Sequence, residues 1–341
     1  MYSHGTKLQK EGQTALNSLK ARKIEPMHVQ MSKDPDGVVG QTSRIVLSGA
    51  SGMLGTALRE RLGALGVPIV QLMRGAPGKE GQVSWDPLKT PAIADASLLE
   101  GCSAAIHLSG ANVAAHRWTA AYRQELTASR ADSTHALAAI LAGLRKPPQT
   151  LVVASAVGIY GDRGDAVLDE ASAPGAGFLA EVCRQWETAA RPALDAGIRV
   201  VHARFGVVVG RGLGALEKML PVFRLGLGGR LGSGRQWMSW ISLGDAVAAI
   251  LFALETESLS GPVNVVSPNA VTNAEFTRAL AREVHRPAVL PVPAFALRLA
   301  LGQMADEALL ASARVAPVKL LSAGFVFAHP TVDQALTAAI G

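Results

Sequence analysis

Three evenly spaced glycines, Gly49, Gly52 and Gly55, are the residues whose spacing most clearly points to chemistry. An apolar run at residues 45–47 precedes them, and residues 56–62 follow with the Ala, Leu and charged residues that favour helix. The pattern predicts a strand, a tight turn and a helix. Such a turn directs backbone N–H groups and the positive end of the helix dipole at a pyrophosphate, and glycines allow it a close approach. The expected ligand is therefore a dinucleotide.

The end of the second predicted strand, residues 67–73, indicates which dinucleotide. A fold of this kind that selects NAD usually has an Asp or Glu there for the ribose 2′-hydroxyl, whereas a basic residue accommodates a 2′-phosphate. This strand ends in Gln71-Leu72-Met73-Arg74, without an acid. NADP(H) is therefore the expected cofactor, with Arg74 as its candidate contact. For the three glycines the alternative is an ordinary glycine-rich loop between a strand and a helix. For Arg74 the alternative is a solvated loop arginine.

The composition describes a globular chain. Hydrophobic residues make up 49% and charged residues 18% of 341 residues, enough for one large or two ordinary domains. No apolar run is long enough to cross a bilayer, so a cytoplasmic location is expected. Only Cys102 and Cys183 are present, without ligand spacing, so neither a disulfide framework nor a metal site is expected.

The net charge of +6 is uneven, because residues 1–44 hold seven Lys/Arg and four acids. No basic helix interleaved with aromatics follows, so a nucleic-acid partner is not expected. Residues 1–43 are polar and end in a turn-rich run. This composition is less typical of a targeting peptide than of a disordered extension, an expression scar or a translation start assigned too far upstream.

From Arg44 onward strands and helices alternate, which predicts a doubly wound parallel sheet. After the strands at 45–48 and 67–73 come a short segment at 83–86, a helix near 95–100 and a strand at 104–109. A long helix at 120–144 precedes a strand at 150–155, a helix at 178–196 and a strand at 199–205. This order is the one that a Rossmann-type domain requires.

Four later segments strengthen that interpretation: HLSGA at 107–111, SAVGIYG at 155–161, RFGVV at 204–208 and WMSWISLGD at 237–245. With the glycine turn they resemble the short-chain dehydrogenase/reductase superfamily, particularly its extended branch of NAD(P)-dependent epimerases and dehydratases. Further segments are similar to the "epimerase family protein" group typified by bacterial YfcH, which has its own short C-terminal domain. These are Arg117-Trp118, Ser129-Arg130, Trp186-Glu187, GSGRQW at 232–237 and GFVF at 324–327. The resemblance covers about residues 44–339.

The resemblance implies where the cofactor binds. In the superfamily the HLSG-like segment passes under the adenosine and ribose, and the exit of the strand at 199–205 lines the nicotinamide and substrate side. The candidate cofactor-binding residues are Gly49, Ser51, Gly52, Met53, Leu54, Gly55, Arg74, Leu108, Ser109, Gly110, Ala154, Phe205 and Gly206.

The catalytic residues of the superfamily are missing. Its members use a Tyr-x-x-x-Lys pair, in which the lysine lowers the tyrosine pKa so that the tyrosine acts as acid/base. The tyrosines here are Tyr2, Tyr122 and Tyr160, and none has a lysine four residues later. Alignment on Trp186-Glu187 places Leu179 at the tyrosine position and Cys183 at the lysine position. Alignment on Tyr160-Gly161 places Ala156 at the usual serine position. The resemblance therefore concerns the fold and cofactor site and does not carry the reaction over.

Ser155 and Tyr160 are the candidate substitutes, because both lie near the expected nicotinamide position. A strand-end serine and a packed tyrosine explain them equally well. Cys183, Glu181 and His202 are weaker candidates, since an unpaired helix cysteine, a helix-face glutamate and a strand histidine are more often structural.

The glycine-rich region after Gly206 predicts a helix at 216–225, and Pro293 precedes an apolar helix. Six side chains could line an aromatic and cationic wall for an anionic or ring-bearing ligand: Arg224, Arg230, Arg235, Gln236, Trp237 and Trp240. The alternative is a flexible loop whose tryptophans seal the lobe.

The predicted fold is α/β, a Rossmann-type doubly wound parallel sheet with a smaller C-terminal substrate-side lobe. The domains are a disordered extension at 1–43, an NADP-binding Rossmann domain at 44–205, and at 206–341 a mixed substrate-side lobe with a small helical C-terminal domain whose elements partly return to the Rossmann core. Two functions fit. One is an NADP(H)-dependent epimerase, dehydratase, oxidoreductase or isomerase acting on an unidentified small molecule, for example a nucleotide sugar or a carbonyl compound. The other is a non-catalytic NADP(H)-binding regulator or partner protein. The expected partner is a small molecule, with neither nucleic acid nor membrane.

Overall fold

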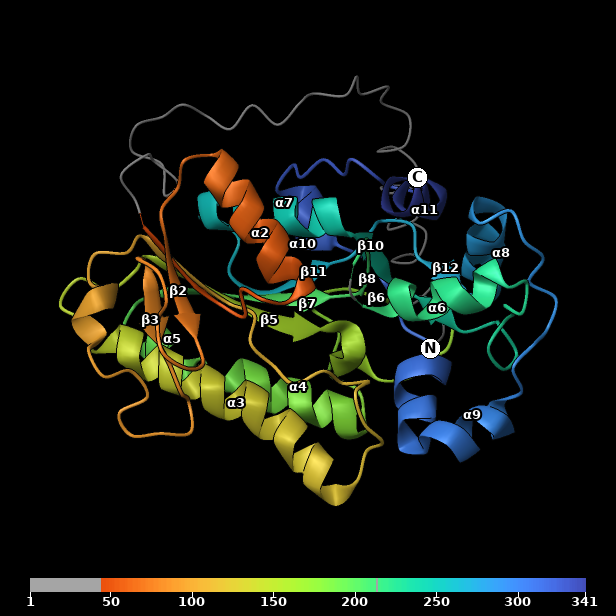
Figure 1. Ribbon diagram of the computed structural model, residues 1–341, viewed down its shortest axis with the longest axis horizontal. Coiled ribbons are helices and arrows are strands. Elements are labelled where there is room, and N and C mark those ends of the chain that lie inside the picture. Colours follow the sequence, from red (N-terminus) through yellow and green to blue (C-terminus); the bar gives the residue numbers. More distant parts are fainter. Residues whose placement is uncertain (1–43, 213) are drawn as a thin grey trace, which may run out of the picture. The chain divides into compact units, whose positions relative to one another are not determined.

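A seven-stranded parallel sheet is the centre of the computed structural model, which describes residues 44–212 and 214–341 (Figure 1). The prediction for residues 1–43 lies outside the described residues. The strands, in sheet order, are β11 (Gly261–Val265), β7 (Arg199–Phe205), β5 (Thr150–Ala156), β4 (Ala104–His107), β1 (Ile45–Ser48), β2 (Ile69–Met73) and β3 (Gln82–Ser84). All six neighbouring pairs are parallel.

The order of the strands reverses between β1 and β4. From β1 the chain continues to β2 and β3, and then returns to the other side of β1 with β4, β5, β7 and β11. Ser48, at the end of β1, therefore pairs with Leu72 on one side and with His107 on the other. In open parallel sheets ligands bind outside the carboxyl ends of the strands at this reversal. The topology therefore predicts that a ligand binds at the loops after β1 and β4, a position that we call the crevice.

The strands are mostly apolar because both faces of the sheet are covered. All four residues of β1 and of β4 are buried, as expected for a parallel sheet between helices. Helices α2 (Met53–Ala64) and α7 (Leu243–Glu255) cover one face, and α3 (Ala120–Ala142), α4 (Phe178–Thr188) and α5 (Arg191–Asp195) cover the other (Figure 1). The predicted Rossmann-type α/β fold is confirmed.

Some predicted boundaries differ from the structure. The helix expected at 178–196 is two helices, α4 and α5, because Pro192 in the first turn of α5 has no N–H to continue α4. The helix expected near 95–100 is a 3₁₀ helix, Ala96–Leu99, which Asp95 caps. The strand expected to reach residue 109 ends at His107.

The C-terminal half has its own apolar core beside the sheet. Its elements are β8 (Val207–Val209), α6 (Ala215–Arg224), β9 (Trp237–Met238), β10 (Trp240–Ser242), β12 (Val271–Thr272), α8 (Asn273–Glu283), α9 (Ala294–Leu301), β13 (Arg314–Val315), α10 (Val318–Ser322) and α11 (Val332–Ile340). Strands β8, β9 and β13 pair with β10, β12 and β6 (Val167–Leu168) in two-stranded sheets. Phe223, Trp240, Phe276 and Leu336 form the centre of this core. No helix among the described residues has both the length and the apolar character to cross a membrane.

Candidate functional site

The glycine turn after β1 is shaped by close backbone packing. Gly49 has a φ of +71°, and a Cβ there would lie 2.6 Å from the carbonyl carbon of Leu108. A Cβ on Gly55 would overlap the carbonyl oxygen of Gly49. These two glycines are required because the turn, the start of α2 and the loop after β4 touch through their backbones.

Gly52 has a different role, because no protein atom requires glycine at this position. It has extended backbone angles that any residue adopts, and a Cβ there would lie 3.5 Å from its nearest protein neighbour. Gly52 is also the N-cap of α2, where no side chain caps the helix and the first turn contains no acid. The first N–H groups of α2 are therefore left for an anion, and the exposed Gly52 leaves the approach to them open. This arrangement fits the diphosphate of a dinucleotide.

The loop after β4 forms the other wall of the crevice. Leu108 and Ser109 are half-buried and Gly110 is exposed. Directly beneath them, the buried His107 bonds to Ser48 Oγ through Nδ1 (2.6 Å) and to Ser133 Oγ through Nε2 (3.1 Å). Ser133 Oγ donates its proton to the carbonyl of Ser129 (2.7 Å), so His107 Nε2 carries the proton and Nδ1 accepts from Ser48. Burial lowers the pKa of His107 to about 4, so the neutral ring holds the ends of β1 and β4 together.

Arg74 stands exposed directly after β2. Among the described residues no carboxylate lies within ion-pair distance of its guanidinium, and no acid occupies the end of β2. Asp86, which follows β3, pairs instead with Lys89 (3.3 Å). The guanidinium is therefore available to a phosphate.

The remaining candidate cofactor residues lie in or just beyond the carboxyl-terminal parts of β1, β5 and β7. Ser51 is exposed, and Met53 and Leu54, in the first turn of α2, are half-buried. Ala154 in β5 and Phe205 in β7 are buried, and Gly206 is half-buried. The fold therefore brings these residues to one edge of the sheet.

Ser155 and Tyr160 belong to a buried polar network. Ser155 Oγ donates to Glu187 Oε1 (2.8 Å), and Tyr160 Oη donates to Asn264 Oδ1 (2.7 Å). Arg204 joins the two by donating from Nη1 to Tyr160 Oη (2.9 Å) and from Nε and Nη2 to the two Glu187 oxygens, both at 2.8 Å. Tyr160 is completely buried, and this burial raises its pKa although Arg204 opposes the shift. These contacts favour structural roles for both side chains.

The weaker candidates also have structural surroundings. Cys183 is buried against the start of the 3₁₀ helix at 157–160, and burial raises the pKa of its thiol to about 11. Burial lowers the pKa of His202 in β7. Glu181 pairs with Arg184 on the outer face of α4. Leu179 packs on Gly158, where a Cβ would lie 3.4 Å from the leucine Cβ.

One residue of the C-terminal region reaches the start of α4 and was not a sequence candidate. Glu307 accepts the backbone N–H groups of Phe178 (3.0 Å) and Leu179 (2.8 Å). Gly177 has a φ of +109°, and a Cβ there would lie 3.0 Å from Glu307 Oε2. The carboxylate thus caps α4 beside Leu179. No local pattern signals this contact, because 128 residues separate Leu179 from Glu307.

The six side chains of the expected wall do not share one surface. Trp240 is completely buried in the core of the C-terminal half, and Gln236 is buried and donates to the carbonyls of Leu231 and Leu309. Arg230 donates to the carbonyls of its own loop. Trp237 donates to Asp165 (2.9 Å) and stacks with Arg314. These contacts favour the alternative in which the tryptophans seal the lobe.

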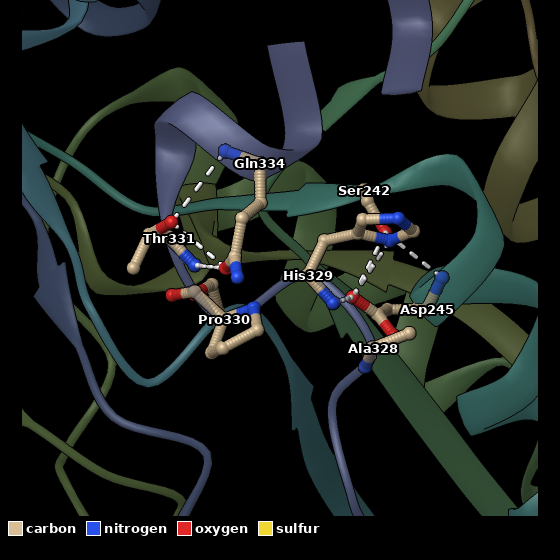
Figure 2. A network of polar contacts seen from close by, with 8 residues as sticks. Ser242, Asp245, Ala328, His329, Pro330, Thr331 and Gln334 are labelled. Atoms are coloured by element: carbon tan, nitrogen blue, oxygen red, sulfur yellow. Dashed lines mark hydrogen bonds and ion pairs between the residues drawn. The ribbon is translucent and has the colours of Figure 1, made fainter. Parts of the chain in front are cut away.

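Ser242, Asp245 and His329 form a cluster at the start of α7 that holds the backbone of residues 328–329 (Figure 2). Asp245 accepts the backbone N–H groups of Ala328 (2.7 Å) and His329 (2.9 Å) and the Ser242 hydroxyl (2.9 Å). His329 Nδ1 lies near both Ser242 Oγ (3.3 Å) and Asp245 (3.7 Å). In a catalytic triad the two ring nitrogens would face the acid and the serine separately. The cluster therefore holds the segment before α11 against α7, and it lacks the geometry for nucleophilic catalysis.

Two other features lie apart from the crevice. A surface hollow of about 630 Å³ between α3, α4 and α5 is lined by His135, Glu181 and Arg191 among others. None of its lining residues belongs to the glycine turn or the strand ends, so it is separate from the candidate cofactor site. In the described ranges no three His, Cys, Asp or Glu side chains come together as a metal site.

Comparisons with known proteins match this geometry. Residues 45–266 match the NAD dependent epimerase/dehydratase family, and residues 292–339 match a domain of unknown function, DUF1731. The epimerase family protein Mb2239 of Mycobacterium bovis is 46% identical over 292 residues, which cover 86% of this chain and 96% of that protein. The epimerase family protein SDR39U1 of Homo sapiens is 36% identical over 297 residues, which cover 86% and 98%.

Solved structures agree with these sequence matches. Human SDR39U1, crystallised with NADPH, superposes with a TM-score of 0.79 at 35% identity, covering 86% of this chain and 98% of that one. A Corynebacterium glutamicum protein described as a nucleoside-diphosphate sugar epimerase superposes with a TM-score of 0.70 at 35% identity, covering 86% of this chain and 58% of that one. The NADPH in the human protein agrees with the predicted NADP(H) cofactor. The sheet order, the glycine turn and these matches together show that the chain belongs to the NAD dependent epimerase/dehydratase family.

Proposed function

We propose that this protein binds NADP(H) across the carboxyl ends of β1 and β4 and uses it for hydride transfer with a small molecule. The observation that carries the proposal is the uncapped N-terminus of α2 behind Gly52. Its free N–H groups hold the diphosphate, and Arg74 contacts the 2′-phosphate. The NADPH in human SDR39U1 supports the same cofactor.

The remaining candidate residues complete the site. Ser51, Met53 and Leu54 contribute backbone donors of the turn, and Leu108, Ser109 and Gly110 form the wall beside the adenosine and ribose. Ala154, Phe205 and Gly206 border the nicotinamide, which supplies the hydride when bound.

The acid/base that completes such a reaction is not the pair used by the superfamily. Leu179 and Cys183 occupy the tyrosine and lysine positions, and neither side chain exchanges a proton near neutral pH. Ser155 and Tyr160 remain the candidate hydroxyl groups, although Glu187, Arg204 and Asn264 engage them. An oxidoreductase or isomerase built on this site therefore takes its proton from solvent or from the substrate itself.

A second function follows from the same network. A protein that binds NADP(H) without turnover needs the glycine turn and Arg74 and has no use for a free acid/base. The engagement of both Ser155 and Tyr160 favours this alternative, a nucleotide-binding regulator or partner protein.

A titration followed by a substrate screen separates the two functions. Binding of NADPH and NADH is measured by fluorescence for the native chain and for Arg74→Met, which should weaken NADPH alone. Loss of reduced-nicotinamide absorbance is then followed with nucleotide sugars and carbonyl compounds, the first class because of the Corynebacterium glutamicum relative. Turnover supports the enzyme, and binding without turnover on either class supports the regulator. A native chain that binds neither nucleotide refutes both.

A further inference from the structure

The C-terminal half exposes six large apolar residues on three neighbouring segments. Each of them is between 49% and 77% exposed. Single apolar residues scattered over a surface need no explanation, whereas a contiguous group marks a binding surface. We call these six residues the apolar edge: Leu225 and Leu227 after α6, Val289 and Leu290 after α8, and Phe295 and Leu299 on α9.

Backbone hydrogen bonds place the first two segments side by side. The N–H of Leu290 donates to the carbonyl of Gly228 (3.3 Å), and two residues further along both segments the same pairing repeats at 2.9 Å. Paired segments of extended chain lie about 5 Å apart. Leu227 and Val289, which precede the first pair, are therefore neighbours.

Helix α9 continues the apolar edge, because it begins directly after the paired segment, with Pro293 as its N-cap. Figure 1 shows the connection from α8 leading into α9. Phe295 and Leu299 are four residues apart and therefore lie on one face of the helix, 72% and 77% exposed. Leu297, on the opposite face, is buried and holds α9 against the molecule. Two large apolar side chains thus project from the outer face of α9.

The same segments carry positive charge. Residues 221–235 and 284–300 contain five arginines and no Asp or Glu. Asp306 neutralises one of them, Arg298, at 2.8 Å. No carboxylate of the described residues lies within ion-pair distance of the other four, which are Arg224, Arg230, Arg235 and Arg286. Arg286 donates instead to the backbone carbonyl of Arg224 (3.2 Å). The surface that fits these segments is therefore anionic.

Charge and shape together select the kind of partner. Two copies that met through this face would bring like charges together, which disfavours a symmetric dimer. Phe295 and Leu299 stand out from their surroundings, and such side chains are better accommodated by a fluid phase than by a flat protein surface. Apolar side chains beside cations are typical of segments that lie at a membrane surface.

We propose that the apolar edge and its arginines dock this protein on an anionic lipid surface. Phe295 and Leu299 enter the boundary between headgroups and acyl chains, and the arginines contact the lipid phosphates. The expectation of no membrane partner rested on the length of the apolar runs, which excludes a helix that crosses a bilayer and does not exclude docking at its surface. This inference is independent of the proposed cofactor.

The test is sedimentation of the full chain with vesicles of phosphatidylcholine, alone or mixed with phosphatidylglycerol, at several salt concentrations. The native chain should bind the mixed vesicles far more tightly, and salt should weaken this binding because it screens the arginines. Phe295→Ser with Leu299→Ser should weaken binding by about tenfold to a hundredfold, since both apolar anchors are lost. Leu88→Ser is the matched control and should bind like the native chain, because Leu88 is as exposed as Leu299 but follows β3.

A second pair of variants tests the charges. Arg224→Gln with Arg286→Gln should weaken binding to the mixed vesicles about tenfold and reduce its dependence on salt. Arg61→Gln with Lys79→Gln removes the same net charge from exposed positions of the nucleotide-binding half and should leave binding unchanged.

Four results would overturn the proposal. They are a native chain that sediments with neither vesicle, equal binding to both vesicles, native binding by Phe295→Ser with Leu299→Ser, and equal losses in the two charge variants. Sedimentation velocity without vesicles tests a different occupant: self-association that Phe295→Ser with Leu299→Ser abolishes would assign the apolar edge to contacts between copies and would also overturn the proposal. All variants should melt and bind NADPH like the native chain, so failure here leaves the cofactor site standing.

Discussion

Replacing Glu187 by glutamine should destabilise the fold sharply while leaving the cofactor crevice in place. The side chains of Glu187 and Arg204 are only 14% and 6% exposed, and two hydrogen bonds of 2.8 Å join them. Burial opposes the charge of Arg204, but the Glu187 carboxylate and the Tyr160 hydroxyl outweigh it and raise the pKa of Arg204. Neutralising Glu187 therefore leaves a buried guanidinium without its counter-charge.

The expected loss is about 3–5 kcal/mol of unfolding free energy, the usual cost of removing one partner of a buried ion pair. Because folded proteins are stable by roughly 5–15 kcal/mol, this is a large fraction of the total. Urea unfolding followed by tryptophan fluorescence measures it, and the melting temperature should fall by roughly 6–10 °C.

Glu181→Gln is the matched control, because Glu181 lies on the same helix and its ion pair with Arg184 is about half exposed. It should change the free energy of unfolding far less than Glu187→Gln does, because water screens an exposed ion pair. Replacing both buried partners, as in Glu187→Gln with Arg204→Met, should recover part of the loss by removing the unpaired cation. If Glu187→Gln alone costs no more than Glu181→Gln, the network does not hold a desolvated ion pair and the structural interpretation of Ser155 and Tyr160 fails.

Two further predictions concern the crevice itself. Gly52→Ala should melt like the native chain and raise the Kd for NADPH at least tenfold, whereas Gly55→Ala should impair both folding and binding, because only the Cβ at Gly55 would overlap backbone atoms. Native NADPH affinity in Gly52→Ala would refute the site. The pKa of His107 is about 4 in the fold against 6.5 when unfolded, so its stabilisation is complete above pH 6.5 and is lost as the pH falls toward 4. Between pH 7 and pH 5 the native chain should therefore lose about 2 kcal/mol more unfolding free energy than His107→Gln, and equal losses in urea titrations would contradict the buried neutral ring.

The local sequence was sufficient for the nucleotide-binding half of the fold. Alternating apolar runs and helical segments indicate the parallel sheet, since a strand covered on both faces is mostly apolar, as β1 and β4 are up to Ser48 and His107 at their ends. The glycine spacing indicates the turn, because the backbone packs too closely at Gly49 and Gly55 to leave room for a Cβ. The atoms that pack there belong to the turn itself and to the adjoining loop after β4. Arg74 is found by the same local logic, as the residue that follows β2.

Long-range contacts decided the rest, and they leave no periodic signal. Ser155 and Tyr160 look available in the sequence, but Glu187, Arg204 and Asn264 reach them from other elements and engage their hydroxyl groups. Glu307 caps α4 from the C-terminal region.

The charge of Arg204 is evident from the sequence, but its pairing with the carboxylate of Glu187 depends on how the tertiary fold brings α4 beside β7. Backbone geometry and burial patterns are properties of short segments and can be read from the sequence. The partner of a polar side chain is a property of the packed molecule, because it is selected among groups that only the tertiary fold brings within hydrogen-bond distance.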